Sequence, residues 1–148
     1  MKEPFLGKNP QEKTRAYIAG NLREKPNREL LEQVDNVCKK LKFQTYLPHK
    51  DKGLFEEGMD SKEFFKHNID RLEWCNLIVA VLDWRGISSG TAWELGYGYA
   101  KKKPCIALVE DKKSLTKEFR ICVMCFNPSV ELVDGLDELE ERLKKVKR

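Results

Sequence analysis

The spacing of hydrophobic positions divides the chain into alternating strand-like and helix-like segments. Residues 76–82 (NLIVAVL) and 104–109 (PCIALV) are almost continuously apolar, as is typical of strands that are buried on both faces of a parallel sheet. Residues 27–42 instead carry apolar side chains three and four positions apart, as an amphipathic helix does. The same reasoning predicts further strands at 15–19, 43–47 and 130–133 and further helices at 60–74, 91–102 and 136–146.

Strand-like and helix-like segments alternate about five times along the chain. This alternation predicts an α/β fold, with a doubly wound sheet of about five parallel strands. Residues 1–14 are polar and contain two prolines, so we expect an N-terminal arm followed by one domain over 15–148. The charged, glycine-containing segment 49–59 is predicted to be a loop, and residues 118–124 have a weak helical pattern. Ligands of such folds bind beyond the carboxyl ends of the strands, so the loops there are the candidate binding segments.

Composition and charge exclude several classes of protein. The longest apolar run, residues 77–82, has six residues, whereas a membrane-spanning helix needs about 18–20. The N-terminus has no apolar core of the kind that a secretory signal contains. The net charge of +4 is a mild bias toward anionic ligands and too weak to indicate nucleic acid as a partner. A membrane or secreted protein is therefore not expected.

The cysteines indicate a reducing, cytoplasmic compartment. There are five of them, an odd number that does not suggest a disulfide framework. The single CxxC motif at 122–125 has no second pair or adjacent histidine, so we predict no metal site. No GxGxxG motif is present, and no dinucleotide or other cofactor is expected.

The strongest chemical signal lies in residues 83–98 (DWRGISSGTAWELGYG), where a loop rich in serine and glycine follows a buried strand. Ser88 and Ser89 offer hydroxyl groups, and Gly90 permits close approach of the backbone to a ligand. A helix that starts here presents free N–H groups, which attract an anion. The segment therefore predicts a cradle for a phosphate or a sugar.

Glu94 has two interpretations from its spacing alone. In the first turn of the predicted helix 91–102, the helix dipole would keep its carboxylate ionised, which suits a nucleophile. Thr91 and Glu94 also have the spacing of a capping box, in which Glu94 only accepts the Thr91 N–H. A capping box tolerates glutamine at position 94, whereas a nucleophile does not.

Four blocks of residues together resemble the nucleoside 2-deoxyribosyltransferase family, which includes 2′-deoxynucleoside 5′-monophosphate N-glycosidases. The blocks are residues 17–21 (YIAGN), 77–83 (LIVAVLD), 90–100 (GTAWELGYGYA) and 103–106 (KPCI). The resemblance covers roughly residues 15–110, and its most specific part is the sequence GTAWELG.

The resemblance implies a flavodoxin-like, Rossmann-like fold and a retaining cleavage of an N-glycosidic bond. Glu94 corresponds to the family's nucleophile, which attacks the anomeric carbon, forms a glycosyl ester and expels the base. Tyr17 corresponds to a tyrosine whose hydroxyl holds that carboxylate. Water then hydrolyses the ester, or a second base captures the sugar.

The resemblance favours nucleotides over nucleosides. Family transferases of free nucleosides carry an aspartate at the position of Ser88. An aspartate there would repel a phosphate, whereas the serine hydroxyl would not. Gly90, and Arg23 three residues after Gly20, match the monophosphate hydrolases, and the forked donors of arginine suit a phosphate. The further implied substrate-binding positions are Asn21, His49 and Asp83. From the residues alone, Arg23 is equally well a solvated loop residue, Ser88 a turn residue and His49 a loop residue without a role.

Two positions depart from the family pattern. Asn68 stands where many relatives have an aspartate near the nucleophile, and an amide orients a group but cannot act as a carboxylic acid. Cys122, two residues before Met124, stands where relatives supply a polar side chain to the neighbouring subunit's site. The resemblance thus implies a homodimer or larger homo-oligomer. Three functions follow: cleavage of (2′-deoxy)nucleoside 5′-monophosphates, base exchange between free deoxynucleosides, or nucleotide binding without catalysis.

Overall fold

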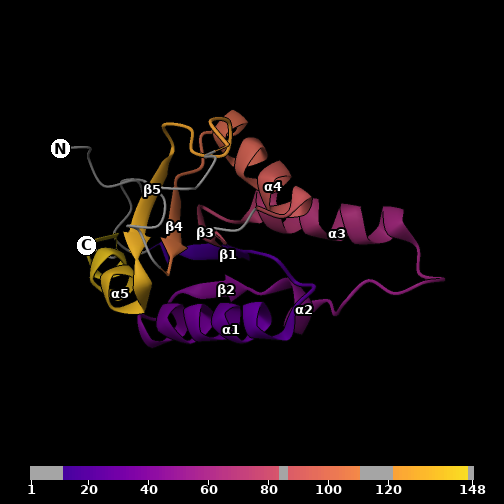
Figure 1. The fold of residues 1–148 in the computed structure, drawn as a ribbon, viewed down its shortest axis with the longest axis horizontal. Helices are drawn as coiled ribbons and strands as arrows, with labels where there is room; N and C mark the ends of the chain where they lie inside the picture. Colours follow the sequence, from indigo (N-terminus) through magenta and orange to yellow (C-terminus); the bar gives the residue numbers. More distant parts are fainter. Residues whose placement is uncertain (1–11, 84–86, 111–121, 147–148) are drawn as a thin grey trace.

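The computed structural model describes residues 12–83, 87–110 and 122–146. A sheet of five parallel strands in the order β2-β1-β3-β4-β5 forms its centre (Figure 1). The strands are β1 (Arg15–Ala19), β2 (Gln44–Tyr46), β3 (Leu77–Val81), β4 (Cys105–Val109) and β5 (Val130–Asp134). The helices are α1 (Lys25–Lys40), α2 (Pro48–Asp51), α3 (Ser61–Trp74), α4 (Ser89–Ala100) and α5 (Gly135–Val146). The predicted α/β class and the doubly wound parallel sheet are confirmed.

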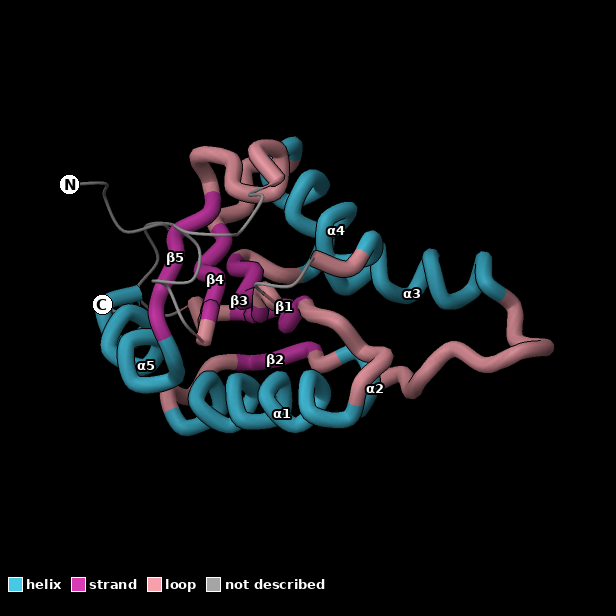
Figure 2. Tube along the Cα trace, in the orientation of Figure 1, coloured by secondary structure: helices cyan, strands magenta, loops and turns pink. Residues whose placement is uncertain are grey.

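Helices cover both faces of the sheet. Figures 1 and 2 show α1 and α5 on one face and α3 and α4 on the other. Alternate residues of β1 point to the two layers: Ala16 and Ile18 join the core under α1 and α5, whereas Tyr17 and Ala19 join the core under α3 and α4. No helix in the described part of the chain is long and apolar enough to cross a membrane.

The order of the strands reverses beside β1. The chain passes from β1 to β2 on one side and then returns to β3 on the other side of β1. The segments that follow β1 and β3 therefore diverge and leave a crevice beyond the carboxyl ends of these strands. Tyr17 lies at this point, paired in register with Tyr46 on one side and Ile78 on the other. Folds of this kind bind their ligands at this position.

Two predictions about local structure are corrected. The segment after β2 was expected to be a loop, but Pro48–Asp51 forms the short helix α2, because proline suits the first position of a helix and the Asp51 carboxylate accepts the Leu47 N–H at 2.7 Å. Helix α4 starts at Ser89 rather than at residue 91. Most of the segment 118–124 and residues 1–11 of the N-terminal arm lie outside the described residues.

Candidate active site

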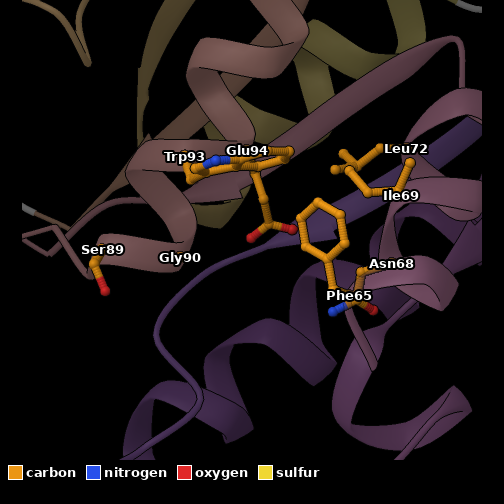
Figure 3. A pocket seen from close by; sticks show the side chains of 8 residues that line it. All are labelled: Phe65, Asn68, Ile69, Leu72, Ser89, Gly90, Trp93 and Glu94. Atoms are coloured by element: carbon orange, nitrogen blue, oxygen red, sulfur yellow. The ribbon is translucent and has the colours of Figure 1, made fainter. Parts of the chain in front are cut away.

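A cavity of about 410 Å³ lies between α3 and α4. Figure 3 shows the Glu94 carboxylate pointing into it, with Phe65 and Asn68 of α3 on one side and Ser89 and Gly90 of α4 on the other. The described residues that line it are Phe65, Asn68, Ile69, Leu72, Ser89, Gly90, Trp93 and Glu94. The two helices that cover the same face of the sheet thus provide the walls, and each supplies both polar and apolar groups.

Ser88 precedes the first residue of α4 and caps the amino end of the helix. Its Oγ accepts a hydrogen bond from the Thr91 N–H at 3.3 Å and bonds to Thr91 Oγ1 at 2.7 Å. Ser88 is thus the N-cap, and the capping box that Thr91 and Glu94 were considered to form is wrong. Glu94 lies six residues after the cap, beyond the first turn in which it was expected. Its side chain is therefore not needed to start the helix and points into the cavity instead.

The Glu94 carboxyl is withdrawn from water. The residue as a whole is half-buried, with its carboxylate at the bottom of the cavity. Burial raises the pKa of Glu94 to about 7, and a weaker, opposing effect of Tyr17 lowers it. The expectation that the helix dipole keeps Glu94 ionised is therefore wrong, because desolvation outweighs it at this position. Near neutral pH the carboxyl exists in both protonation states.

Tyr17 lies beneath Glu94 on β1. The residue is completely buried, and its hydroxyl forms no hydrogen bond of ordinary geometry with the described residues. Burial and the neighbouring Glu94 carboxylate raise the pKa of Tyr17 far above its usual range. The hydroxyl therefore stays protonated and keeps a proton to donate, with the Glu94 carboxylate as the nearby anion.

Asn68 is held in place by Tyr46. The Tyr46 hydroxyl at the end of β2 donates a hydrogen bond of 2.9 Å to Asn68 Oδ1. The Tyr46 ring also packs against the Tyr17 ring, with centroids 5.3 Å apart. Two tyrosines on neighbouring strands thus support two of the polar groups of the cavity, Tyr17 below Glu94 and Tyr46 below Asn68.

Aromatic rings form the outer rim of the cavity. Phe65 and Trp93 meet edge to face, with centroids 5.6 Å apart, and the Tyr97 ring stacks on the Trp93 ring with centroids 5.6 Å apart. Phe65 is 58% exposed and Trp93 is 49% exposed. Large apolar side chains this exposed beside a cavity provide a surface on which a planar ring can stack.

The predicted residues after β1 lie on the loop that leads to α1. The backbone at Gly20 passes close to α1, since an added Cβ would lie 2.7 Å from Leu31 Cδ2. The Asn21 Oδ1 accepts the Arg23 N–H at 2.9 Å and shapes the loop. Arg23 is exposed. These three residues share the edge of the sheet at which the cavity opens, but they do not line the cavity.

Three further predicted residues also lie outside the cavity lining. His49 of α2 is buried against α1, with Nε2 3.0 Å from Glu32 Oε1. Asp83 follows β3 and is half-buried. Cys122 is exposed on a turn before β5, where its sulfur contacts Cys125. Among the described residues, no group of three or more His, Cys, Asp or Glu side chains could hold a metal ion.

Sequence reasoning missed Tyr46 and Phe65 as residues of the site. Phe65 belongs to an apolar series on α3 that predicts a core-facing side, and only the path of α3 past the edge of the core turns it toward the cavity. Tyr46 carries no motif at all. Its contact with Asn68 joins residues 22 positions apart, which no local pattern indicates.

The chain is similar to known proteins both in its sequence and in its fold. A sequence model of the nucleoside 2-deoxyribosyltransferase family matches residues 16–136. No curated protein is similar enough in sequence to count as a match.

Several solved structures share the fold. A 2-deoxyribosyltransferase from Bacillus psychrosaccharolyticus has a TM-score of 0.71 and 17% identity, over 86% of this chain and 90% of that chain. A conserved protein from Enterococcus faecalis V583 has a TM-score of 0.69 and 22% identity, over 90% and 99% of the two chains. A CMP N-glycosidase from Clostridium botulinum has a TM-score of 0.61 and 19% identity, over 89% and 98%.

The matched region extends from β1 to the start of α5 and includes the cavity, with Glu94 inside it. The helix α4, which carries this carboxylate, lies wholly within the matched region. The chain therefore belongs to the nucleoside 2-deoxyribosyltransferase family.

Proposed function

We propose that this protein cleaves the N-glycosidic bond of (2′-deoxy)nucleoside 5′-monophosphates with retention, through a covalent intermediate on Glu94. The observation that carries the proposal is the Glu94 carboxylate at the bottom of a cavity with an aromatic rim. The ionised carboxylate attacks the anomeric carbon, the bond to the base breaks, and a glycosyl ester forms. Water then attacks the anomeric carbon and frees Glu94.

The base-binding end of the cavity is assigned to α3 and the aromatic rim. Phe65 and Trp93 offer ring faces and edges to a planar base. Asn68, whose carbonyl oxygen is occupied by Tyr46, has its amino group available as a donor to the departing base or to a sugar hydroxyl. This donor supports departure of the base by hydrogen bonding rather than by transfer of a carboxylic proton.

The phosphate-binding end is assigned to the start of α4. The first N–H groups of a helix have no partner within the helix, and here they include those of Ser89 and Gly90 on the cavity wall. The helix dipole favours an anion at the same place. Ser88 keeps this end of the helix in position, and Arg23 approaches the phosphate from the loop after β1. The similar solved structure of a CMP N-glycosidase supports a nucleotide substrate.

The remaining residues have supporting roles in this proposal. Gly20 and Asn21 set the course of the loop that carries Arg23. Asp83, at the end of β3, contacts the sugar. His49 holds α2 against α1 through Glu32 and acts on the substrate only through this packing.

We also propose that the protein is a homo-oligomer. Tyr99 of α4 is 56% exposed, and Phe65 and Trp93 are also exposed. Large apolar side chains that are exposed to solvent occur at association surfaces. Light scattering on the intact protein and on Tyr99→Glu tests this, and a monomeric wild type would contradict it.

The decisive experiment measures base release by chromatography. The substrates are a panel of nucleosides and their 5′-monophosphates, each with and without an added acceptor base. Wild type is compared with Glu94→Gln and with Glu73→Gln, a matched control on α3 whose carboxylate accepts a hydrogen bond from Tyr97 at the surface. Mass spectrometry of the quenched reaction detects a glycosyl adduct on the peptide that contains Glu94.

The expected result is base release from monophosphates by wild type and by Glu73→Gln, but not by Glu94→Gln. If base release requires an acceptor base and occurs with free nucleosides, the reaction is base exchange rather than hydrolysis. The similarity to the solved structure of a 2-deoxyribosyltransferase supports this alternative. Nucleotide binding without base release in any variant would indicate a binding module and contradict catalysis by Glu94.

A further inference from the structure

Two cysteines face each other on the turn before β5. Cys122 Sγ and Cys125 Sγ are 2.8 Å apart. The Cys125 N–H donates to the Cys122 carbonyl oxygen at 3.0 Å and closes the turn. The Cys105 N–H binds the Ser129 carbonyl oxygen, so the turn lies near the amino ends of β4 and β5, whereas Glu94 follows the carboxyl end of β3. Neither cysteine lines the cavity.

The two thiols have different surroundings. Cys122 is exposed, and its neighbours Val123 and Met124 are 80% and 81% exposed. Cys125 is only 5% exposed and packs into the core under α4. The hydrogen bond from Cys125 lowers the pKa of Cys122, whereas burial raises the pKa of Cys125 to about 11. The Cys122 thiol is thus accessible and ionises more readily to a thiolate, and the Cys125 thiol is buried next to it.

The other cysteines have no such arrangement. Cys38, Cys75 and Cys105 are buried in the two cores. Burial raises the pKa of each of them, to about 12 for Cys38 and about 11 for Cys75. Buried thiols with raised pKa values react slowly. An oxidant in solution therefore reaches Cys122 first.

We propose that Cys122 and Cys125 form a site of reversible oxidation, at which a peroxide converts the dithiol into an intramolecular disulfide. The proposal goes beyond the proposed function and does not depend on it. It rests on the short distance between the sulfurs, the closed turn that holds them and the exposure of one sulfur beside a buried partner. In a disulfide the two sulfurs are about 2.05 Å apart, and here they already lie within 2.8 Å of each other.

The reaction proceeds in two balanced steps. The Cys122 thiolate attacks one oxygen of the peroxide, so an S–O bond forms, the O–O bond breaks, and hydroxide leaves and takes up a proton to become water. Cys125 then loses its proton, and its sulfur attacks the sulfenic acid on Cys122. The S–S bond forms, the S–O bond breaks, and a second hydroxide becomes water. Two thiols lose two electrons, and hydrogen peroxide becomes two molecules of water.

The first step prepares the second. The Cys122 sulfur is one of the groups that raise the pKa of Cys125. Once it carries a neutral sulfenic acid, its negative charge is gone, and Cys125 ionises more readily. The pair therefore passes through the sulfenic acid to the disulfide before a second peroxide molecule can oxidise Cys122 further.

The test exposes the reduced, full-length protein to hydrogen peroxide and counts thiols after denaturation. The expected result is the loss of two thiols per chain and their recovery with dithiothreitol. The tryptic peptide 121–142, which contains both cysteines, should lose about 2 Da, the mass of two hydrogen atoms. Non-reducing electrophoresis should show no covalent dimer.

Two matched variants separate the steps. In Cys125→Ser, Cys122 should accumulate as a sulfenic acid that dimedone traps, and without dimedone it should be oxidised further to the sulfinic acid. In Cys122→Ser, Cys125 should resist peroxide concentrations that oxidise the wild type. Circular dichroism establishes that both variants are folded.

Three results would overturn the proposal. These are survival of both thiols in the wild-type peptide, equally rapid formation of sulfinic acid in wild type and Cys125→Ser, or a disulfide between two chains in place of the internal one.

Discussion

The Tyr46 hydroxyl donates a hydrogen bond of 2.9 Å to Asn68 Oδ1 and joins the end of β2 to the cavity wall on α3. With its oxygen engaged, the Asn68 amide has its amino group left for the cavity. An aspartate at this position would accept the same hydrogen bond but would offer the cavity a second acceptor or, when protonated, an acid. The hydrogen bond from Tyr46 thus leaves the Asn68 side chain as a neutral hydrogen-bond donor toward the cavity.

Tyr46→Phe should lower the turnover number for base release about threefold to tenfold, the effect of one lost hydrogen bond on the orientation of Asn68. The Michaelis constant should change less. Tyr97→Phe is the matched control, because the Tyr97 hydroxyl binds Glu73 on the protein surface. Steady-state kinetics of both variants tests this. Equal losses in the two variants would contradict a specific role for Tyr46.

The rate of base release should rise with pH through a pKa of about 7. Only the ionised Glu94 carboxylate attacks the sugar, and burial raises its pKa to about 7. Well below that value the rate should fall about tenfold for each pH unit, because the ionised fraction does so. Initial rates between pH 5 and pH 9 measure this, and a flat profile would show that Glu94 does not act as the ionised nucleophile.

Glu94→Gln should stabilise the fold at alkaline pH. A carboxyl whose pKa is higher in the folded protein binds its proton more tightly there, so its contribution to stability is full below the unfolded pKa of about 4.5 and is lost as the pH rises through about 7. At pH 8 the variant should gain about 1–3 kcal/mol in the free energy of unfolding. At pH 4 the gain should vanish.

Urea denaturation at the two pH values measures this gain, with Glu73→Gln as the control. Hydrogen bonding to Tyr97 lowers the pKa of the exposed Glu73 carboxyl, so its replacement should give no gain at pH 8. A similar stabilisation in both variants would contradict the assignment to desolvation of Glu94.

Much of the fold could be predicted from the chain because local pattern and tertiary environment agree. The strand at 15–19 has the predicted bounds, and the apolar runs at 76–82 and 104–109 contain β3 and β4, since a strand buried on both faces needs apolar residues throughout. The start of α4 was displaced because Ser88 and Thr91 can both cap a helix, and only the folded backbone selects Ser88.

The candidate site was predictable only in part: Asn68, Gly90 and Glu94 line the cavity, most of the other predicted residues do not, and the electrostatic environment was not predicted. Sequence blocks indicated Glu94, and the structure puts it in the cavity. Its pKa depends on how much water the surrounding side chains exclude, which is a property of the packed domain. The contact between Tyr46 and Asn68 is also a property of the packed domain, because it joins the end of β2 to α3.

The amino-terminal half of α3 should open without unfolding of the domain. Along the helix only Leu72, in the last turn, is fully buried, while Phe65 belongs to the first half, which extends past the sheet. Local opening costs little where little apolar surface is buried. Amide hydrogens of residues 62–68 should therefore exchange with solvent faster than those of β3, and a nucleotide in the cavity should slow them. Entry of a ligand is then governed by the local stability of half a helix, while the sheet that carries Tyr17 stays intact.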